Sequence, residues 1–428
     1  MARIRKKLGG WGMSSEACFL QDVAEVVDSL HKTPHYSEFG PSMVRVTDVK
    51  YGELDLSKTF RVDAEVFAEF SRRYKPSRGD IIITRVGTYG VFGKVLDTNF
   101  CLGQNTAAII PKTIAPDYLY AVLNSNFVKS QIESSVVGST QKTLSLKAIK
   151  ALQIPRFRPS QELVIGSLGA TFDDRITLLR ETNTTLEAIA QALFKSWFVD
   201  FDPVHAKMQG RAPEGMDEAT AALFPDSFEE SELGPVPKWW RHVSLKDVVS
   251  IHDSKRIPLS GQERDKRKGR YPYYGAAALM DSVDDYLFDG IYLLTGEDGS
   301  VADANGYPIM QYVWGKFWVN NHAHILQGKD GVSTEHVMLA LQQTNITPYI
   351  TGAVQAKLSQ TNMWRINFTM PNREVAELFG TLLEPIFVLF RHNSEQAKTL
   401  ITLRDTLLPR LISGQIQISD VQTEAESA

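Results

Sequence analysis

The sequence contains very little cysteine: Cys18 and Cys101 are its two thiols among 428 residues. Two cysteines cannot form the disulfide framework that holds small secreted domains together, so we expect a reducing, cytoplasmic compartment. Long apolar runs are missing too, because no stretch approaches the roughly 18 residues of a transmembrane helix. The basic residues within 3–7 are followed by glycines within 9–12, not by the apolar core of a signal peptide. We therefore expect no membrane association.

Catalytic motifs are also missing. The Gly328-Lys329 pair lacks the glycine spacing and the serine or threonine of a P-loop, and no His-Glu-x-x-His helix is present. The Gly-x-Ser-x-Gly nucleophile elbow is absent, as is the Asn/Asp-Pro-Pro-Tyr/Phe tetrapeptide of amino-methyltransferases. His322 and His324 alternate along a predicted strand, but two histidines make an incomplete metal site. We expect no catalytic residue, metal site or cofactor site in this chain.

The net charge is small, with a formal value of −4 at pH 7, and a small negative charge at first argues against a nucleic-acid partner. The distribution of charge is uneven, however. Acidic side chains concentrate in residues 200–233 and in the tail at 415–428, which leaves a positive net charge on the rest of the chain. Because binding to phosphates depends on the local surface, the composition permits a DNA partner without requiring one.

A long internal repeat is the most informative feature that the sequence does contain. Sets of identical residues recur at one constant offset, and a second set opens each half of the chain. A duplication this long indicates two related domains rather than a solenoid, whose repeats are about 20–50 residues long. It suits a protein that reads two different targets a fixed distance apart. The first offset carries Gly138, Gln141, Leu144, Ser145, Glu181, Leu186 and Leu193 onto Gly352, Gln355, Leu358, Ser359, Glu395, Leu400 and Leu407, and the second carries Leu20, Asp22, Val23, Asp28 and Ser29 onto Leu245, Asp247, Val248, Asp253 and Ser254.

Each half begins with an α+β region. Short β-type runs are separated by glycines, as is typical of strands joined by turns. A helical spacing of apolar residues follows the strands. We predict strands at residues 44–46, 80–86, 91–96 and 106–110 with a helix at 118–128, and strands at 290–295, 310–314, 316–320 and 324–326 with a helix at 335–344.

Each half then ends in a long amphipathic helix, the first predicted at residues 165–198. Apolar residues recur at steps of three and four, the spacing of a coiled-coil seam. Polar Asn183, Asn393 and Gln396 lie within these stripes and can fix the register. A single helix of this kind would more often just cover a core, whereas two related helices favour packing against each other. A helix of this length exceeds one turn of DNA, which is about 34 Å.

An acidic segment with several prolines separates the two halves and is predicted to be a linker with some local order. The predicted organisation is a first domain at 1–155, a helix at 156–200, the linker at 201–235, a second domain at 236–370, a helix at 371–416 and an acidic tail at 417–428.

Several strings resemble the specificity subunits of type I restriction–modification systems. Their central conserved region resembles residues 192–204 (ALFKSWFVDFDPV), 207–215 (KMQGRAPEG), 222–226 (ALFPD) and 232–240 (ELGPVPKWW), and their distal conserved region resembles 407–416 (LLPRLISGQI). Residues 271–275 (YPYYG), 297–299 (EDG) and 320–324 (NNHAH) are similar to segments of one type of recognition domain. The conserved-region strings are the more specific ones, because recognition domains diverge with the DNA that they read.

The resemblance implies an α+β fold with two similar α/β target recognition domains, separated by two long helices that pack as an antiparallel coiled coil, and an internal pseudo-twofold repeat. Each domain would read one half of a bipartite site in double-stranded DNA, and the helices would dock two modification subunits. Those subunits would hold S-adenosylmethionine and methylate adenine. Two restriction subunits, with ATP and magnesium, would make the full complex an ATP-dependent endonuclease. The missing catalytic motifs agree with this division of labour.

Candidate DNA-binding residues are polar, basic or aromatic side chains near loops, which can reach phosphates or groove edges. The loop at 87–90 can equally be a plain hairpin turn, Gln141 and Gln355 can equally satisfy a turn, and the basic run at 264–270 can be a solvated face. The candidates are Lys32, His35, Tyr36, Arg45, Thr47, Arg85, Thr88, Tyr89, Thr140, Gln141, Lys142, Lys255, Arg256, Arg264, Lys266, Arg267, Lys268, Arg270, Tyr273, Tyr274, Asn321, His322, Gln355 and Lys357. The candidate subunit-interface residues are Leu186, Ile189, Leu193, Trp197, Leu400, Leu403, Leu407 and Leu411.

The leading hypothesis is thus a non-catalytic DNA-specificity subunit. One alternative is the recognition component of a different restriction or modification system, which keeps DNA reading but changes the partner. Another is a coiled-coil scaffold whose two domains bind protein, which predicts no sequence-specific DNA binding.

Overall fold

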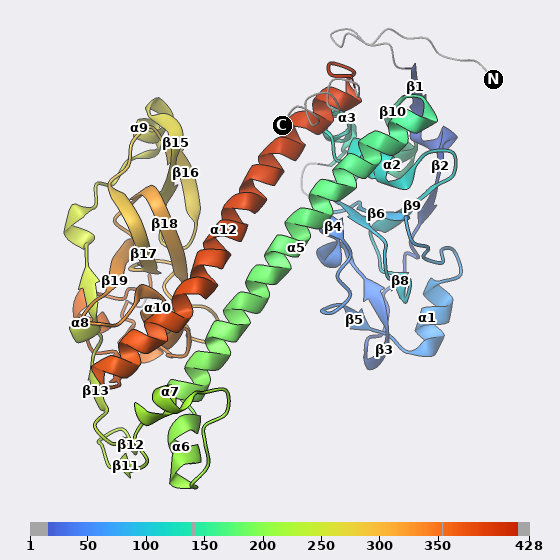
Figure 1. The fold of residues 1–428 in the computed structure, drawn as a ribbon. Helices are drawn as coiled ribbons and strands as arrows, with labels where there is room; N and C mark the ends of the chain where they lie inside the picture. Colours follow the sequence, from blue (N-terminus) through green and yellow to red (C-terminus); the bar gives the residue numbers. More distant parts are fainter. Residues whose placement is uncertain (1–15, 139–141, 353, 418–428) are drawn as a thin grey trace. The chain divides into compact units, whose positions relative to one another are not determined.

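The computed structural model describes residues 16–138, 142–352 and 354–417 (Figure 1). The chain forms two compact units, one of Met1–Leu179 with Gln396–Ala428 and the other of Arg180–Glu395. Two helices of 40 residues each, α5 (Pro159–Phe198) and α12 (Arg373–Ile412), contribute a part to both units. Among the described residues, no helix is both long enough and apolar enough to cross a membrane.

The first unit is built on a five-stranded sheet of order β2-β9-β6-β7-β4 and a three-stranded sheet of order β5-β3-β8. Side chains alternate between the faces of a strand, so Ile81 and Ile83 enter one core while Ile82 enters another. The strands are β1 (Glu16–Phe19), β2 (Ala24–Asp28), β3 (Ser37–Val44), β4 (Gly52–Glu53), β5 (Phe60–Arg61), β6 (Ile81–Thr84), β7 (Phe92–Lys94), β8 (Phe100–Leu102), β9 (Thr106–Pro111) and β10 (Gln153–Arg156), and the helices are α1 (Ala64–Phe70), α2 (Pro116–Leu123), α3 (Asn126–Ser135) and α4 (Leu146–Lys150).

The second unit is built on a six-stranded sheet of order β14-β19-β17-β18-β15-β16. The same alternation places Leu293 in one core and Leu294 in another. Its strands are β13 (Arg241–Ser244), β14 (Val249–Ile251), β15 (Lys268–Tyr274), β16 (Leu279–Val283), β17 (Phe288–Gly296), β18 (Met310–Val319), β19 (Ala323–Gly328) and β20 (Asn367–Met370), and its short helices are α8 (Leu245–Val248), α9 (Gly261–Lys266), α10 (Thr334–Gln342) and α11 (Gln360–Met363).

The repeat predicted from sequence recurs as structure. The offset that carries Gly138 onto Gly352 also carries α5 onto α12 and β10 onto β20, end to end. The second offset carries β1 onto β13. Both strand pairs are antiparallel in the same register, Glu16 opposite Arg156 and Arg241 opposite Met370. Each half of the chain therefore consists of the same supersecondary arrangement followed by the same long helix.

The long helices pack antiparallel within each unit, as the figure shows for α5 and α12 (Figure 1). In the first unit, the Arg404 guanidinium pairs with Asp173 at 2.8 Å. In the second unit, Trp197 and Phe198 of α5 pack against Phe379 of α12, with ring centroids 5.4 Å and 4.7 Å apart. The helices thus pack on each other and also cover the cores of both units.

A polar contact interrupts this apolar seam in the second unit. The Asn183 amide donates to the carbonyl of Phe390 at 3.0 Å and to the hydroxyl of Ser394 at 2.9 Å. The amide of Asn393, a buried residue, donates to the Asn183 side-chain oxygen at 3.0 Å. Because these bonds form in one register only, they select one alignment of the helices.

Replacing Asn183 by alanine is expected to lower the free energy of unfolding by about 1–3 kcal/mol, because it leaves the buried Asn393 amide without its acceptor. Urea unfolding measures the loss. Thr184→Ala is the matched control, since Thr184 is exposed and its hydroxyl bonds the Arg180 carbonyl of its own helix. Equal losses in the two variants would show that the polar contact does not hold the helices in register.

Several predicted boundaries were wrong, for local reasons. The predicted helix at 118–128 is two helices, because the Ser125 hydroxyl caps a new one at the Val128 amide. The strands predicted at 310–314 and 316–320 are one strand, β18, which passes through Gly315 at φ +74°. Residues 44–46 do not form a strand of their own, because β3 ends at Val44.

The segment between the halves is more ordered than a linker composition suggests. It forms α6 (Asp202–Met208), α7 (Glu218–Ala222) and the pair β11 (Phe228–Glu229) and β12 (Val236–Pro237). Val204, Phe224 and Val236 are buried in the core of the second unit. The segment is therefore a packed connection within that unit.

Candidate nucleic-acid interface

Two loops pair with each other at one edge of the first unit. Residues 86–90 follow β6, and residues 137–143 follow α3, of which 139–141 lie outside the described residues. Val86 bridges to Thr143, the Gly87 amide donates to the Lys142 carbonyl at 3.2 Å, and Val137 pairs with Thr143. We call this arrangement the first loop pair.

The second unit repeats the arrangement. Asp298 bridges to Lys357, the Gly299 amide donates to the carbonyl of Ala356 at 2.9 Å, and Thr351 pairs with Lys357. These contacts define the second loop pair, residues 298–301 with 351–357. Each turn uses a glycine in the left-handed region, Gly138 at φ +112° and Gly352 at φ +94°. At the described residues, the two units therefore repeat the same backbone pairing with different side chains.

A buried ion pair lies beneath the first loop pair. The Arg85 guanidinium, 8% exposed, donates to the Asp28 carboxylate and, at 3.2 Å, to the carbonyl of Leu144. The exposed ring of His31 also bonds Asp28, at 2.8 Å. We had predicted Arg85 as a DNA-contacting residue, but this placement favours a role in holding the loops, because removing a paired charge from its partner inside a protein is costly.

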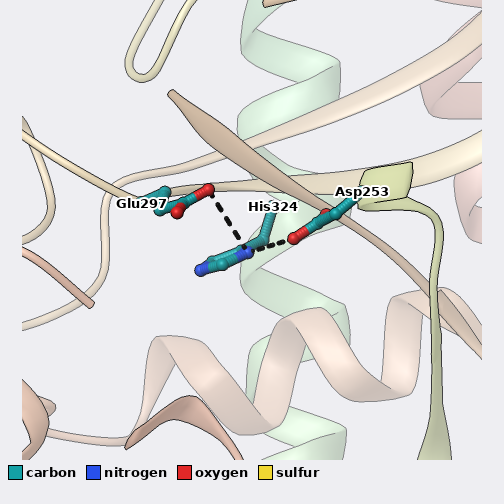
Figure 2. Close-up of side chains that lie close together, drawn as sticks. All are labelled: Asp253, Glu297 and His324. Carbon is teal, nitrogen blue, oxygen red and sulfur yellow. Dashed lines mark hydrogen bonds and ion pairs between the residues drawn. The ribbon is translucent and has the colours of Figure 1, made fainter. Parts of the chain in front are cut away.

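A larger charge cluster adjoins the second loop pair, and Figure 2 shows three of its members, Asp253, Glu297 and His324. The ring of His324, 1% exposed, lies with Nδ1 2.6 Å from the Asp253 carboxylate and 3.9 Å from that of Glu297. The Arg256 guanidinium contacts Glu297 at 2.7 Å and Asp253 at 3.5 Å. Asp253, Glu297 and His324 could together hold a metal ion. Because the Arg256 guanidinium already contacts both carboxylates, we interpret the cluster as an ion-pair network.

Opposing influences act on the pKa of His324. Burial works to lower the pKa, but the hydrogen bond and charge of Asp253, the Leu358 carbonyl and the charge of Glu297 outweigh it. The pKa of His324 therefore lies above its ordinary value of 6.5. The protonated ring is accordingly the form that the surrounding carboxylates stabilise.

Some predicted DNA-binding residues come together at the loop pairs. In the first pair Thr88 is exposed, and the Lys142 ammonium lies over the ring of Tyr89, 5.7 Å from its centroid. The Tyr89 hydroxyl also donates to Glu133 at 3.0 Å. In the second pair Gln355 and Lys357 are exposed, and the exposed side chains of Asn321 and His322 lie beside it, where the His322 ring bonds Asp298 at 2.5 Å. Arg256 contacts Glu297 next to this pair.

Other predicted residues make their contacts outside these loops. The basic run is largely neutralised within the β15–β16 region, because Arg264 and Lys268 pair with Asp281 and Arg267 pairs with Asp284. Tyr273 is buried, and Tyr274 packs on Phe317, while Lys255, Lys266 and Arg270 are exposed. In the first unit Lys32 pairs with Glu69, Arg45 pairs with Asp48 over the ring of Phe60, Tyr36 packs on Phe60, and His35 and Thr47 are exposed. Thr140 and Gln141 lie outside the described residues.

The predicted subunit-interface residues divide by burial. Trp197 and Leu411 are buried within the cores of their own units, so a docking partner does not reach them. Leu186, Leu193, Leu400 and Leu407 are half-buried. Ile189 and Leu403 are 46% and 44% exposed and occupy matching places in the repeat. These two are the side chains of the set that a partner can contact.

The carboxylates that pair with Arg85 and His324, those of Asp28 and Asp253, were missed as site residues. Asp28 and Asp253 were visible in the sequence as matching members of the repeat, yet they carried no motif. Their pairing with Arg85 and His324 depends on which strands lie side by side, and that information appears only in the fold. A repeated acidic residue at the end of a strand was the available signal.

Comparison with known proteins gives a consistent result. The family model of the type I restriction modification DNA specificity domain matches twice, at residues 19–188 and 237–391. The HindI specificity subunit of Haemophilus influenzae is 27% identical over 411 residues, which cover 79% of this chain and 87% of that protein. The MjaIX specificity subunit of Methanocaldococcus jannaschii is 23% identical over 380 residues, which cover 82% and 81%.

A solved structure supports the architecture. The type I S subunit from M. genitalium superposes with a TM-score of 0.58 at 16% identity, over 95% of this chain and 98% of that one. The predicted resemblance and the fold class, two repeated domains with long helices, are thereby confirmed. Because the family model matches most of both halves, this chain belongs to the type I restriction modification DNA specificity domain family.

Proposed function

We propose that this chain is the DNA-specificity subunit of a type I restriction–modification complex and that each of its two domains reads one half of a bipartite site. The observation that carries the proposal is the duplication of the loop pair. One backbone arrangement recurs in both units, while the side chains that it presents differ. A repeated frame with divergent side chains is what two readers of different sequences require.

The chemistry of the loops suits nucleic acid. Lys142 and Lys357 are exposed cations on the C-terminal segment of each loop pair, where they can contact phosphates. Thr88 in the first pair, Gln355 in the second and Asn321 beside the second offer donors and acceptors for base edges. The glycine turns let the backbone approach the duplex closely.

The helices would serve as the spacer and as the docking site for two modification subunits. Ile189 and Leu403 support this part of the proposal, because a repeated exposed apolar position offers the same contact twice. In this proposal the chain has no catalytic role of its own. S-adenosylmethionine would bind to the modification subunits, and ATP and magnesium to two restriction subunits.

Selection from randomised duplexes tests the proposal. The complex of this chain with its modification subunit should enrich two short sequences separated by a fixed number of unspecified base pairs. Raising the salt concentration from about 50 to about 200 mM should weaken binding by about 10³–10⁵-fold if six to ten phosphates are contacted. A scaffold that binds protein through both domains would enrich no sequence and would show little dependence on salt.

A further inference from the structure

The same two anchor points lie beneath both loop pairs. One is a carboxylate, Asp28 in the first unit and Asp253 in the second, and the two aspartates match in the repeat. The other is the carbonyl of a buried leucine at the end of the loop, Leu144 or Leu358, which also match. In each unit one cationic side chain bonds both anchors, and it thereby ties the end of the loop to the sheet.

The tying side chain differs between the units. In the first unit Arg85 bonds both anchors. In the second, Nδ1 of His324 lies 2.6 Å from Asp253 (Figure 2). Nε2 of the same ring lies 2.8 Å from the Leu358 carbonyl.

The position that matches Arg85 holds the opposite charge in the second unit. The Leu144 amide bonds the Arg85 carbonyl at 2.9 Å, and the Leu358 amide bonds the Glu297 carbonyl at 2.8 Å, so Glu297 takes the place of Arg85. In the second unit the cationic side chain is His324, which lies on the neighbouring strand β19.

The hydrogen bonds of His324 require a protonated ring. An ionised carboxylate and a backbone carbonyl both only accept hydrogen bonds, so each ring nitrogen must carry a hydrogen to bond its partner. Loss of one proton leaves one nitrogen facing an acceptor without a donor. Since the ring is 1% exposed, water cannot readily replace the lost bond.

Four charged groups surround the ring. Asp253 and Glu297 face Nδ1 and favour the proton. Arg256 and Lys357 contact these carboxylates, Lys357 at 3.6 Å from Glu297, and partly offset them. The carboxylates prevail, because the pKa of His324 is raised. The complete bridge is therefore present below the ordinary value of 6.5 and is lost as the pH rises through the raised pKa.

We propose that Arg85 and His324 are positioning residues for the two recognition loops, and that the bridge in the second domain is proton-dependent while that in the first is not. A guanidinium stays charged wherever the protein is folded, whereas an imidazolium does not. This inference rests on the proposed function, since it assumes that both loop pairs contact DNA. A rise in pH is then expected to release the recognition loop of the second domain only.

Hydrogen exchange on the wild-type chain, bound to its modification subunit, tests the bridge without using DNA. Exchange of the hydrogen-bonded amides of Thr351, Lys357 and Leu358 is compared with that of the matching Val137, Thr143 and Leu144 amides in the same molecule, from about pH 6 to about pH 9. After correction for intrinsic exchange, protection in the second segment should fall about ten- to hundredfold as the pH rises, and that in the first should stay constant. Equal pH dependence of the two segments would overturn the proposal.

Binding competition then tests the consequence for recognition. Competitor duplexes altered in one half-site or the other measure how strongly each half is discriminated. As the pH rises, the wild-type complex should lose discrimination at the half-site that the second domain reads and keep it at the other. His324→Gln should show that reduced discrimination at every pH, and Arg85→Gln should reduce discrimination in the other half at every pH.

His205→Gln, an exposed histidine on α6, is the matched control and should follow the wild type. A wild-type pH profile in His324→Gln would contradict the proposal. Absence of discrimination in either half at any pH would mean that the proposed function is wrong, while the hydrogen-exchange comparison would still decide whether the bridge depends on a proton.

Discussion

Replacing Gly352 by alanine is expected to lower discrimination at one half-site by at least about tenfold. Discrimination at the other half-site should stay as in the wild type. Gly352 has φ +94°, and a Cβ there would lie 2.1 Å from the carbonyl oxygen of Gln355. The left-handed conformation alone costs an L-residue about 1–2 kcal/mol, and the clash forces the turn to open. Binding competition with duplexes altered in each half measures the result.

A second glycine in the same unit provides the control. Gly315 has a comparable φ of +74°, but a Cβ there meets no atom within 4 Å. Gly315→Ala should therefore show the cost of the conformation without displacing a recognition loop. If Gly352→Ala keeps full discrimination of both halves, the second loop pair is not a DNA-reading element.

Exchange of residues 1–158 for the matching region of another family member is expected to change one half of the recognised sequence completely and to leave the other half unchanged. The boundary at 158 keeps β10 with its partner β1 and falls just before α5 begins at Pro159. The donor must suit Leu408, Leu411 and Ile412 of α12, which complete the core of the first unit. Sequencing of methylated DNA from cells that express each chimaera gives the readout.

The reciprocal exchange, of residues 238–371, should change the other half only. This boundary retains β13 with β20 and ends before Arg373, where α12 begins. Chimaeras that alter both halves together would show that the two domains do not read independently.

The repeat was the part of the fold that the sequence predicted best. Identical residues recur at a constant offset wherever the two copies must form the same turn. Gly138 and Gly352 recur since both turns need a left-handed residue, and Ser145 and Ser359 recur since both cap a helix. Buried leucines recur beside them. These requirements are local, so they are visible in single residues.

The start of α5 could not be predicted, because it depends on tertiary contacts. The start predicted at residue 165 is later than the observed one. A Cβ on Gly166 would lie 2.5 Å from the backbone nitrogen of Tyr118, so this glycine inside the helix permits close packing. The helix begins at Pro159, and Glu162 in its first turn pairs with Arg156 at 2.6 Å and accepts from the Phe157 amide. A buried ion pair from β10 therefore fixes the helix terminus.

The candidate site was predicted less well than the fold, for the same reason. The basic run looked like a phosphate-binding loop, but Asp281 and Asp284 neutralise much of it from the neighbouring strand. Arg85 looked exposed beside a glycine loop, but Asp28 holds it inside. Charge at the surface depends on which strands are neighbours, and short sequence patterns do not record that.

The measurement that tests the central claim most directly is methylation mapping of the wild-type chain. The chain is co-expressed with its modification subunit in a host without DNA methylation, and N6-methyladenine is located by sequencing. We expect one split motif, two short specific sequences with a constant spacer, methylated throughout the genome. A stable purified complex that leaves the DNA unmethylated would contradict the account and favour a protein-binding scaffold.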